Sequence, residues 1–394
     1  MNKKKEIVPK FRFPKYVNSE QWISTELSSL LDYERPDLYI VESDNYKNEG
    51  IPVLTANKSF ILGYTDEKNN IYSRVPVIIF DDFTTEKKYV DFPFKVKSSA
   101  IKILKPKGNN VLKFVFELMN TINFEAKEHK RYYISTYQKL FVYVPKDVKE
   151  QQNIADCLSS TDDLIDAESR KLKVLEKYKK GLMQKLFPAE GKTLPEWRFP
   201  EFKHCGNWEQ VTLTKVAFYE NGKAHENYIE EYGKYIVVNS KFIATNGEVT
   251  KHSNTANLLA KRGDILMVLS DVPNGRALAK CYFVNGNDKY TVNQRICRLR
   301  PYDIDSLFLF YYVNRNKYFL DFDDGVKQTN LKKSDVLACP LLKPKEKREQ
   351  QKIADCLSEI DTMITEQLKK IERLETHKKG LLQGLFPSLE EVDV

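Results

Sequence analysis

The stretch that decides the fold reads KEQQNIADCLS at residues 149–159 and returns as REQQKIADCLS at residues 348–358. Nine of the eleven positions are identical, and the two stretches lie 199 residues apart. The same offset relates KKGLMQKLFP at 179–188 to KKGLLQGLFP at 378–387. Agreement of this kind at one fixed spacing indicates an internal duplication, so the chain is two copies of one unit.

Each copy also has its own opening segment. VPKFRFPKY at residues 8–16 corresponds to LPEWRFPEF at 194–202 with an offset of 186, and Trp22 and Trp208 continue that register. The change of offset from 186 to 199 means that the regions between the repeated segments differ in length by 13 residues. Those regions share little sequence. A duplicated scaffold with two different inserts indicates that each insert recognises a different target.

The apolar residues from Gln151 to Phe187 have helical spacing with a period of 3.5, and the second copy repeats the pattern. We therefore predict two long helices that pack on each other in antiparallel, coiled-coil-like fashion, related by a pseudo-two-fold axis. The alternative is that each helix is amphipathic and packs only on its own domain. Pro188 and Pro387 are expected to end the helices. The predicted seam consists of Leu158, Ile165, Leu172, Leu175, Leu182, Leu186, Leu357, Ile360, Ile364, Ile371, Leu374, Leu381 and Leu385.

The length of these helices has a consequence for what they could hold apart. A helix of this length spans roughly 55 Å at 1.5 Å per residue. DNA half-sites one turn apart are about 34–36 Å from centre to centre. A helix pair of this size could therefore act as the spacer between two DNA half-sites.

The divergent regions have mixed, mostly β patterns that follow the same order in both copies. In the first copy we expect strands over residues 52–57, 75–80 and 94–104 and a helix over 110–120. In the second copy the strands fall at 235–239, 263–268 and 290–299, and the helix at 306–313. The predicted fold class is α+β, with two mixed α/β recognition domains at 1–145 and 194–345 and two spacer helices at 146–193 and 346–394.

The positive charge of the chain lies in the divergent regions. The 394 residues have a net charge of +8. Residues 1–145 hold 23 Lys and Arg against 18 Asp and Glu, and residues 194–345 hold 22 against 17. An excess of five in each region favours a polyanionic partner, although an ordinary solvated basic surface would give the same figure.

Polar side chains of the types that read bases and bind phosphate are expected in loops of both regions. Asn and Gln can pair with adenine, Arg with guanine, and Lys or Ser with phosphate. The candidate DNA-binding residues are Asn57, Lys58, Tyr64, Lys87, Lys88, Lys97, Ser98, Tyr133, Asn239, Lys241, Asn274, Arg276, Asn293, Gln294, Arg295, Lys332 and Lys333.

Catalytic and metal-binding patterns are missing from the sequence. No nucleotide-binding loop, methyltransferase string or Cys/His cluster at zinc spacing is present, so we expect neither catalytic residues nor a metal site. The six Cys are scattered, and the longest apolar stretches are far shorter than a membrane span of about 20 residues. The basic start, MNKKK, is not followed by the apolar segment of a signal peptide. A cytoplasmic protein without a membrane partner is expected.

Two domains that each end in an EQQ-x-IA helix and a GL-x-Q-x-LFP segment, with RFP-type openings, resemble the specificity subunit of a type I restriction–modification system. The resemblance covers essentially the whole chain. It implies two target recognition domains that each read one half of a bipartite, asymmetric double-stranded DNA sequence, with the helix pair setting the unread spacer. It implies as partners two methyltransferase subunits, docked on the helices, and restriction/motor subunits that join through the assembled complex.

By the same resemblance the chain is non-catalytic and directs adenine methylation or restriction in defence against foreign DNA. The cofactors S-adenosylmethionine, ATP and Mg²⁺ would belong to partner subunits. Two alternatives stay open on the residues alone. One is a stand-alone, two-headed DNA-binding regulator, and the other is a fused restriction enzyme with an unrecognised catalytic site.

Overall fold

The computed structural model describes residues 7–57, 59–128 and 130–388, which form two compact units. Unit 1 comprises Met1–Arg170 and Leu368–Val394, and unit 2 comprises Lys171–Gln367. Helices α2 (Val148–Leu186) and α7 (Lys347–Leu385) have 39 residues each, and each contributes one part to either unit. The compact units thus divide both helices, whereas the sequence pattern predicts the helices as separate segments.

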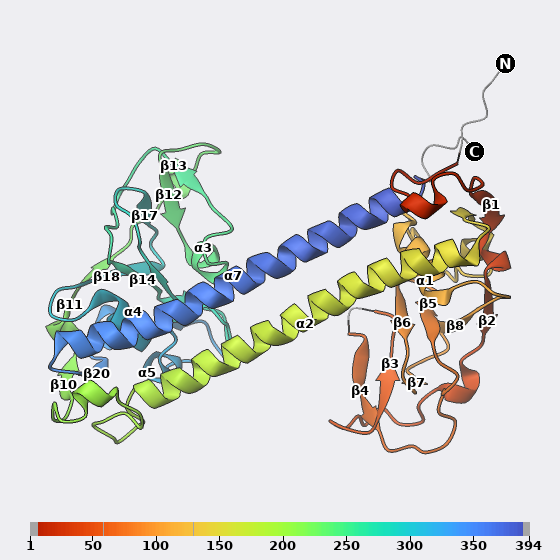
Figure 1. Cartoon of the computed structure of the whole chain (residues 1–394). Coiled ribbons are helices and arrows are strands. Elements are labelled where there is room, and N and C mark those ends of the chain that lie inside the picture. Colours follow the sequence, from red (N-terminus) through yellow and green to blue (C-terminus); the bar gives the residue numbers. More distant parts are fainter. Residues whose placement is uncertain (1–6, 58, 129, 389–394) are drawn as a thin grey trace. The chain divides into compact units, whose positions relative to one another are not determined.

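The described residues of unit 1 form three small sheets and, besides parts of α2 and α7, the helix α1 (Figure 1). A four-stranded antiparallel sheet has the order β2-β8-β5-β6, a three-stranded sheet the order β4-β3-β7, and β1 pairs with β9. The strands and the helix are β1 (Ile23–Glu26), β2 (Leu31–Glu34), β3 (Ile51–Leu54), β4 (Ile61–Thr65), β5 (Val77–Asp81), β6 (Lys87–Val90), β7 (Lys95–Val96), β8 (Ile101–Pro106), α1 (Leu112–Thr121) and β9 (Phe141–Val144).

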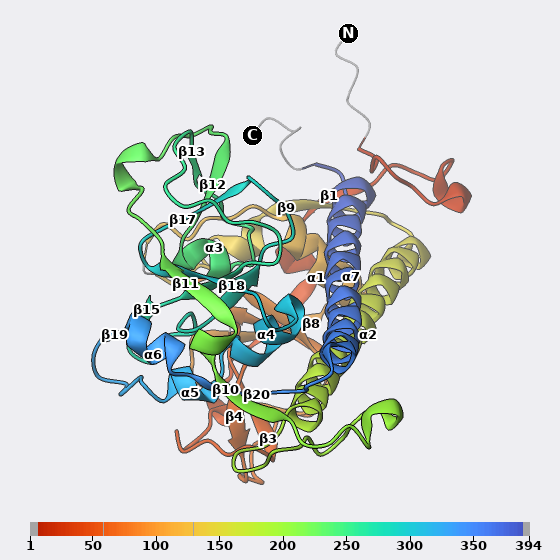
Figure 2. The same ribbon diagram turned by 90° about the vertical axis from the view of Figure 1, so that its left-hand side faces the viewer.

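Unit 2 repeats this topology, and Figure 2 gives a second view of its elements. Its four-stranded sheet has the order β11-β18-β14-β16, its three-stranded sheet the order β13-β12-β17, and β10 pairs with β20. The elements are β10 (Glu209–Thr212), β11 (Ala217–Asn221), β12 (Tyr235–Val238), α3 (Ser240–Ala244), β13 (His252–Ser253), β14 (Ile265–Val268), β15 (Ser270–Asp271), β16 (Cys281–Phe283), β17 (Tyr290–Val292), β18 (Ile296–Pro301), α4 (Ser306–Val313), α5 (Lys317–Leu320), β19 (Thr329–Asn330), α6 (Lys333–Leu337) and β20 (Pro340–Lys343).

The α+β fold class and the common fold of the two inserts are confirmed. The predicted helix at 306–313 coincides with α4, and the one at 110–120 with α1 within two residues. The single strands predicted over 94–104 and 290–299 are wrong in one respect. Each is two strands with a turn between them, because the chain crosses from the three-stranded to the four-stranded sheet at that point.

Side chains along the central strands point alternately to the two faces of the sheet, and each unit therefore has two hydrophobic cores. In β5, Val77 and Ile79 face a core shared with the three-stranded sheet, whereas Ile78 and Phe80 face a core shared with α1 and the long helices. β14 does the same in unit 2 through its four apolar residues. Both faces of the sheet are therefore covered, which explains why these strands read as uninterrupted apolar runs.

The opening segment is joined to the long helix by a buried ion pair. In unit 1 the Arg12 guanidinium donates two hydrogen bonds of 2.8 Å to the Glu150 carboxylate, and Trp22 Nε1 donates a third at 3.3 Å. The hydrogen bonds to Glu150 raise the pKa of Arg12. Unit 2 repeats the arrangement with Arg198, Glu349 and Trp208. The repeated RFP and EQQ motifs are thus two halves of one buried contact.

The next residue of the repeated motif fixes the shorter helix. The Gln151 side chain accepts from the backbone N–H of Val111 at 3.1 Å, just before α1, and donates to the Pro145 carbonyl at 3.3 Å. In unit 2 the Gln350 side chain accepts from Asp305 N, just before α4, and donates to the Pro344 carbonyl, both at 2.8 Å. Buried amides of this kind satisfy backbone groups that a helix start leaves unpaired.

Within each unit α2 and α7 lie side by side and antiparallel (Figure 1). In unit 1 the Lys378 ammonium is 2.6 Å from the Asp162 carboxylate, and in unit 2 Lys179 is 2.5 Å from Asp361. The two pairs occupy equivalent positions of the repeat, 199 residues apart. Every residue of the predicted seam is buried or half-buried, as an interhelical seam requires.

The ends of the seam have a second role. Leu158 and Leu385 lie in the core of unit 1, and Leu186 and Leu357 lie in the core of unit 2. The helices therefore pack on the sheets at their ends, and the ion pairs Asp162–Lys378, Glu168–Lys370 and Lys179–Asp361 join them to each other. Within the described ranges, no helix has the length and apolarity that crossing a membrane would need.

Candidate nucleic-acid interface

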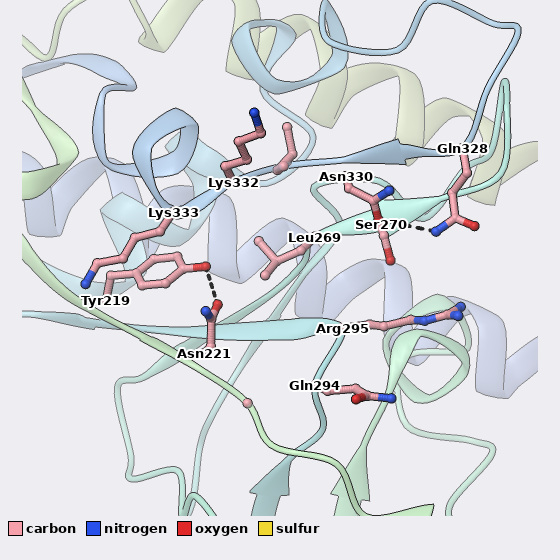
Figure 3. A pocket seen from close by; sticks show the side chains of 12 residues that line it. Tyr219, Asn221, Leu269, Ser270, Gln294, Arg295, Gln328, Asn330, Lys332 and Lys333 are labelled. Atoms are coloured by element: carbon pink, nitrogen blue, oxygen red, sulfur yellow. Dashed lines mark hydrogen bonds between the residues drawn. The ribbon is translucent and has the colours of Figure 1, made fainter.

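A polar pocket of about 510 Å³ lies at one end of the four-stranded sheet of unit 2 (Figure 3). It forms where β11 ends, β18 begins and β15 pairs with β19. Its lining residues are Tyr219, Asn221, Gly222, Leu269, Ser270, Gln294, Arg295, Gln328, Asn330, Leu331, Lys332 and Lys333. They come from four separate stretches of the sequence, so only the folded unit creates this surface.

Backbone hydrogen bonds around Leu269 hold these stretches together. Its N–H donates to the Arg295 carbonyl at 2.9 Å, and its carbonyl accepts from the Leu331 N–H at 2.8 Å. One residue on, Ser270 faces Asn330 across the β15–β19 pair. The side chains of the pocket are thus mounted on paired backbone, which positions them more accurately than free loops would.

Amide side chains dominate the polar part of the pocket. Gln328 donates to the Asn330 side-chain oxygen at 3.2 Å, and in Figure 3 both lie across the pocket from Gln294. Gln294 donates to Glu226 at 3.0 Å, and the Asn221 side-chain oxygen accepts from the Tyr219 hydroxyl. Primary amides present a donor and an acceptor side by side, which is the pattern that pairs with the major-groove edge of adenine.

Three cations complete the pocket. Arg295, Lys332 and Lys333 are exposed, and none of them forms a salt bridge to a described residue. The Lys333 ammonium lies 5.7 Å from the centre of the Tyr219 ring. The described lining residues include no carboxylate, and the adjacent Glu226 is bound to Gln294. A surface of amides and unpaired cations suits a phosphate-bearing polymer with readable base edges.

A second cavity, of about 680 Å³, lies beside β10 and β20 but has different electrostatics. Its Lys343 is bound to Asp303 at 2.6 Å, and the hydrogen bond from Lys343 holds the pKa of Asp303 below its usual range. Glu209 is also part of the lining. One of its two lysines, Lys343, is paired with Asp303, and Glu209 adds a negative charge, so this cavity is the weaker candidate for a polyanion.

The structure brings four of the predicted residues of unit 2 into the pocket, namely Gln294, Arg295, Lys332 and Lys333. The other predicted residues lie elsewhere. The Asn239 side chain caps α3 by accepting from Phe242 N at 2.9 Å, and Lys241 is exposed on that helix. Asn274 and Arg276 are exposed on the loop after β15, where Asn274 N donates to Asp323 at 3.1 Å. The Asn293 side chain accepts from Gln294 N beside the pocket.

In unit 1 the predicted residues are scattered. Tyr64 lies in β4, and Lys87 and Lys88 lie in β6, so their placement in loops is wrong: each is paired into a sheet. Burial lowers the pKa of Lys87. The Asn57 side chain accepts from Thr84 at 3.2 Å. Lys58 lies outside the described residues.

Lys97 and Ser98 lie in the turn between β7 and β8. Lys97 is paired with Asp44, and the hydrogen bond that its ammonium donates to this carboxylate raises the pKa of Lys97. Ser98 is half-buried, and its hydroxyl accepts from Ala100 N at 3.4 Å.

The prediction that Tyr133 binds DNA is wrong. Only 1% of its surface is exposed, because the ring packs between Phe80 and Tyr33 with centroid distances of 5.2 and 5.7 Å. Burial raises the pKa of its hydroxyl. A side chain in this position cannot reach a DNA groove.

Sequence reasoning missed Tyr219, Asn221, Gln328 and Asn330. A signal for the first was present, since Tyr219-Glu220 repeats Tyr33-Glu34 at the 186-residue offset that joins the two openings. Within the described part of the chain, no group of three or more His, Cys, Asp or Glu side chains could hold a metal ion.

The comparisons with known proteins agree with this fold. Residues 206–376, which include the whole pocket, match the family described as the type I restriction modification DNA specificity domain. Over 252 residues the chain is 35% identical to the type I restriction enzyme EcoR124I/EcoR124II specificity subunit of Escherichia coli, covering 60% of this chain and 61% of that protein. It is 26% identical over 260 residues to the MjaVIII specificity subunit of Methanocaldococcus jannaschii, covering 61% and 60%. The matches thus span about three fifths of these relatives.

Solved structures show the same fold over nearly the whole chain. The crystal structure of a type I restriction-modification S subunit from M. genitalium has a TM-score of 0.66 at 17% identity, covering 97% of this chain and 99% of that one. A chain from a structural study of complex assembly in the type I R-M system has a TM-score of 0.54 at 14% identity, covering 93% and 98%. Residues 206–376 thus match the specificity-domain family, and the chain is similar to type I restriction–modification specificity subunits, as its internal repeats indicate.

Proposed function

We propose that this chain is the non-catalytic DNA specificity subunit of a type I restriction–modification complex. Each unit would read one half of a bipartite, asymmetric DNA target. The α2–α7 pair would set the unread spacer and dock two methyltransferase subunits, and restriction/motor subunits would join through the assembled complex. The subunit would thereby direct adenine methylation or restriction in the cytoplasm.

One observation carries this proposal: two units that share three sheets of the same strand order present different side chains at their sheet ends. A scaffold duplicated for stability alone would not need divergent polar surfaces, whereas two readers of different half-sites would. The cation and amide content of the unit 2 pocket fits a DNA groove. The relatives named above are specificity subunits of type I restriction enzymes, which supports the same assignment.

The chemistry of methylation and cleavage is assigned to partners. S-adenosylmethionine, ATP and Mg²⁺ would be bound by the methyltransferase and motor subunits, and this chain would supply sequence recognition. The helices suit a docking role, since Val174 and Tyr178 of α2 expose 66% and 57% of their surface. Exposed apolar side chains on a long helix are typical of protein interfaces.

The decisive experiment maps methylated bases in cells that express this chain together with its methyltransferase. We expect an asymmetric bipartite motif with an unread gap. Replacing residues 194–345 by the corresponding domain of a relative, with both long helices retained, should change one half of the motif only. Changes in both halves, or no motif at all, would refute the assignment. A chain that binds DNA alone and never copurifies with a methyltransferase would instead be a stand-alone regulator.

The pocket can be tested by separating phosphate contacts from base contacts. The double variant K332A/K333A should weaken binding to every sequence and reduce the slope of log K against log salt by about 1.8, since each phosphate contact contributes about 0.9. The matched control K251A/K261A removes the same charge from exposed positions outside the pocket. An equal change in both double variants would exclude the pocket lysines from the interface.

A base contact should behave differently. Asn330→Ala should lower affinity for the cognate half-site by about 1–3 kcal/mol and leave binding to unrelated DNA nearly unchanged, because an amide that reads a base contributes only at its own sequence. Asn239→Ala, which removes an amide from the cap of α3, serves as the comparison. Equal losses on cognate and unrelated DNA would place Asn330 outside base recognition.

A further inference from the structure

The end of the sheet that carries the unit 2 pocket has an equivalent in unit 1, which backbone pairing identifies without reference to side chains. In unit 1, β8 ends at Pro106, which pairs with Leu31 at the start of β2. In unit 2, β18 ends at Pro301, which pairs with Ala217 at the start of β11. Two residues further along, Tyr33 and Tyr219 occupy the same position. The two sheets can therefore be compared residue by residue.

The junction around Leu269 is reproduced around Asp82. The Asp82 N–H donates to the Ala100 carbonyl at 2.8 Å, as the Leu269 N–H does to Arg295. The Asp82 carbonyl accepts from the Tyr132 N–H at 2.8 Å, as Leu269 accepts from Leu331. Each hydrogen bond has its partner in the other unit at a similar length. The same three stretches of backbone therefore meet at the same end of the sheet.

This correspondence identifies which side chains of unit 1 stand where the pocket of unit 2 has its amides and cations. Arg35 takes the place of Asn221, Phe83 that of Ser270, and Arg131 that of Asn330. The buried Tyr133 takes the place of the exposed Lys332, so this position belongs to the core in unit 1 and to the surface in unit 2. The identical Tyr33 and Tyr219 are the shared part of the two surfaces.

Two cations in this part of unit 1 have no carboxylate partner. Arg35 and Arg131 are exposed, and neither forms a salt bridge to a described residue. The Arg131 guanidinium lies 5.9 Å from the centre of the Phe83 ring, which limits its orientations. In contrast, Lys97 and Lys105 of the same domain are paired with acids. Arg35 and Arg131 therefore give this end of the sheet a positive charge that no salt bridge to a described residue neutralises.

We propose that the surface formed by Tyr33, Arg35, Phe83 and Arg131 binds the first half of the DNA target, with Arg131 reading a guanine. The inference rests on the proposed function and names the reading surface of unit 1. Arginine pairs bidentately with the O6 and N7 atoms of guanine, whereas the amides of unit 2 suit adenine. An arginine would thus read the first half of the target and amides the second, at the equivalent end of the four-stranded sheet in each unit.

The test uses the complete chain in complex with its methyltransferase, on duplexes that carry the mapped motif with either half replaced. Arg131→Ala should weaken binding to the intact motif about 10- to 100-fold and abolish the penalty for replacing the first half. Its effect on a duplex lacking the first half should be small. Arg131→Lys keeps the charge but lacks the fork of donors, so it should lose the same discrimination.

Lys88→Ala is the matched control, because β6 lies at the opposite edge of the four-stranded sheet from β2. It removes one positive charge from the same domain and should leave discrimination intact. The proposal is overturned if Lys88→Ala affects first-half discrimination more than Arg131→Ala does, or if Arg131→Lys retains full discrimination. If no bipartite motif is found in the first place, the proposed function itself fails. That outcome is distinct from a motif that forms but does not depend on Arg131.

Discussion

Removing the Glu150 carboxylate should be among the most damaging single changes in unit 1. The side chain is 1% exposed and accepts two hydrogen bonds from Arg12, itself 8% exposed, and one from Trp22. Truncating one partner of a buried ion pair costs about 3–5 kcal/mol, because the other charge stays buried without compensation. Arg12 keeps hydrogen bonds to the carbonyls of Ser19 and Glu20. We therefore expect Glu150→Ala to cost about 3 kcal/mol.

Hydrogen exchange of the native chain, followed by mass spectrometry, measures this loss where it occurs. The amides of residues 149–159 should open with a free energy lower by about 3 kcal/mol, and those of 348–358 in unit 2 should be unaffected. Lys146→Ala is the control, since it breaks an exposed pair with Glu20 and should cost less than about 1 kcal/mol. Equal effects of the two variants would refute the reasoning. The double variant R12M/E150L should recover most of the loss.

Three further changes test the packing and electrostatics elsewhere. Leu158→Ala, at a fully buried position of the unit 1 core, should cost about 2–5 kcal/mol in the same exchange measurement, and a loss below 1 kcal/mol would contradict that packing. Because Lys343 lowers the pKa of Asp303, their ion pair stabilises the fold above the usual pKa of 3.8 and loses its effect as the pH falls below it. The difference in Tm between the wild type and Asp303→Asn should thus be present at pH 7 and vanish near pH 2, and a constant difference would exclude the linkage. Burial raises the pKa of Cys297 to about 12, so its thiol should resist iodoacetamide at pH 8 until the chain unfolds, and rapid labelling of the native protein would show otherwise.

The repeated segments allowed the long helices and their antiparallel pairing to be predicted, because both depend on local periodicity. The turns at 97–100 and 293–295, which divide each predicted strand into two, could not be predicted. Neither turn contains Gly or Pro, and the β pattern continues across it. The change of sheet at each turn is a tertiary property. It follows from which strand lies alongside, and a sequence window does not contain that information.

The candidate site shows the same division. Arg295 and Lys332 were predicted from residue type, because basic residues on polar segments are visible in the sequence. Asn221 and Asn330 were missed, since the fold brings them together across more than one hundred residues. Tyr133 was misplaced for a related reason: a tyrosine suits a wet surface or a core equally well, and only packing decides between them.

The division of the chain into units has a consequence for how the protein is made. Unit 2 is one continuous stretch, Lys171–Gln367, whereas unit 1 needs residues on both sides of it. Leu385 and Phe386 complete the core around Trp22, and the Phe11 N–H donates to the Gly384 carbonyl at 2.7 Å. During synthesis, the first domain to leave the ribosome must therefore wait for residues translated more than two hundred positions later. All residues of unit 2 are translated before unit 1 is complete, so unit 2 can fold first and unit 1 completes its fold last.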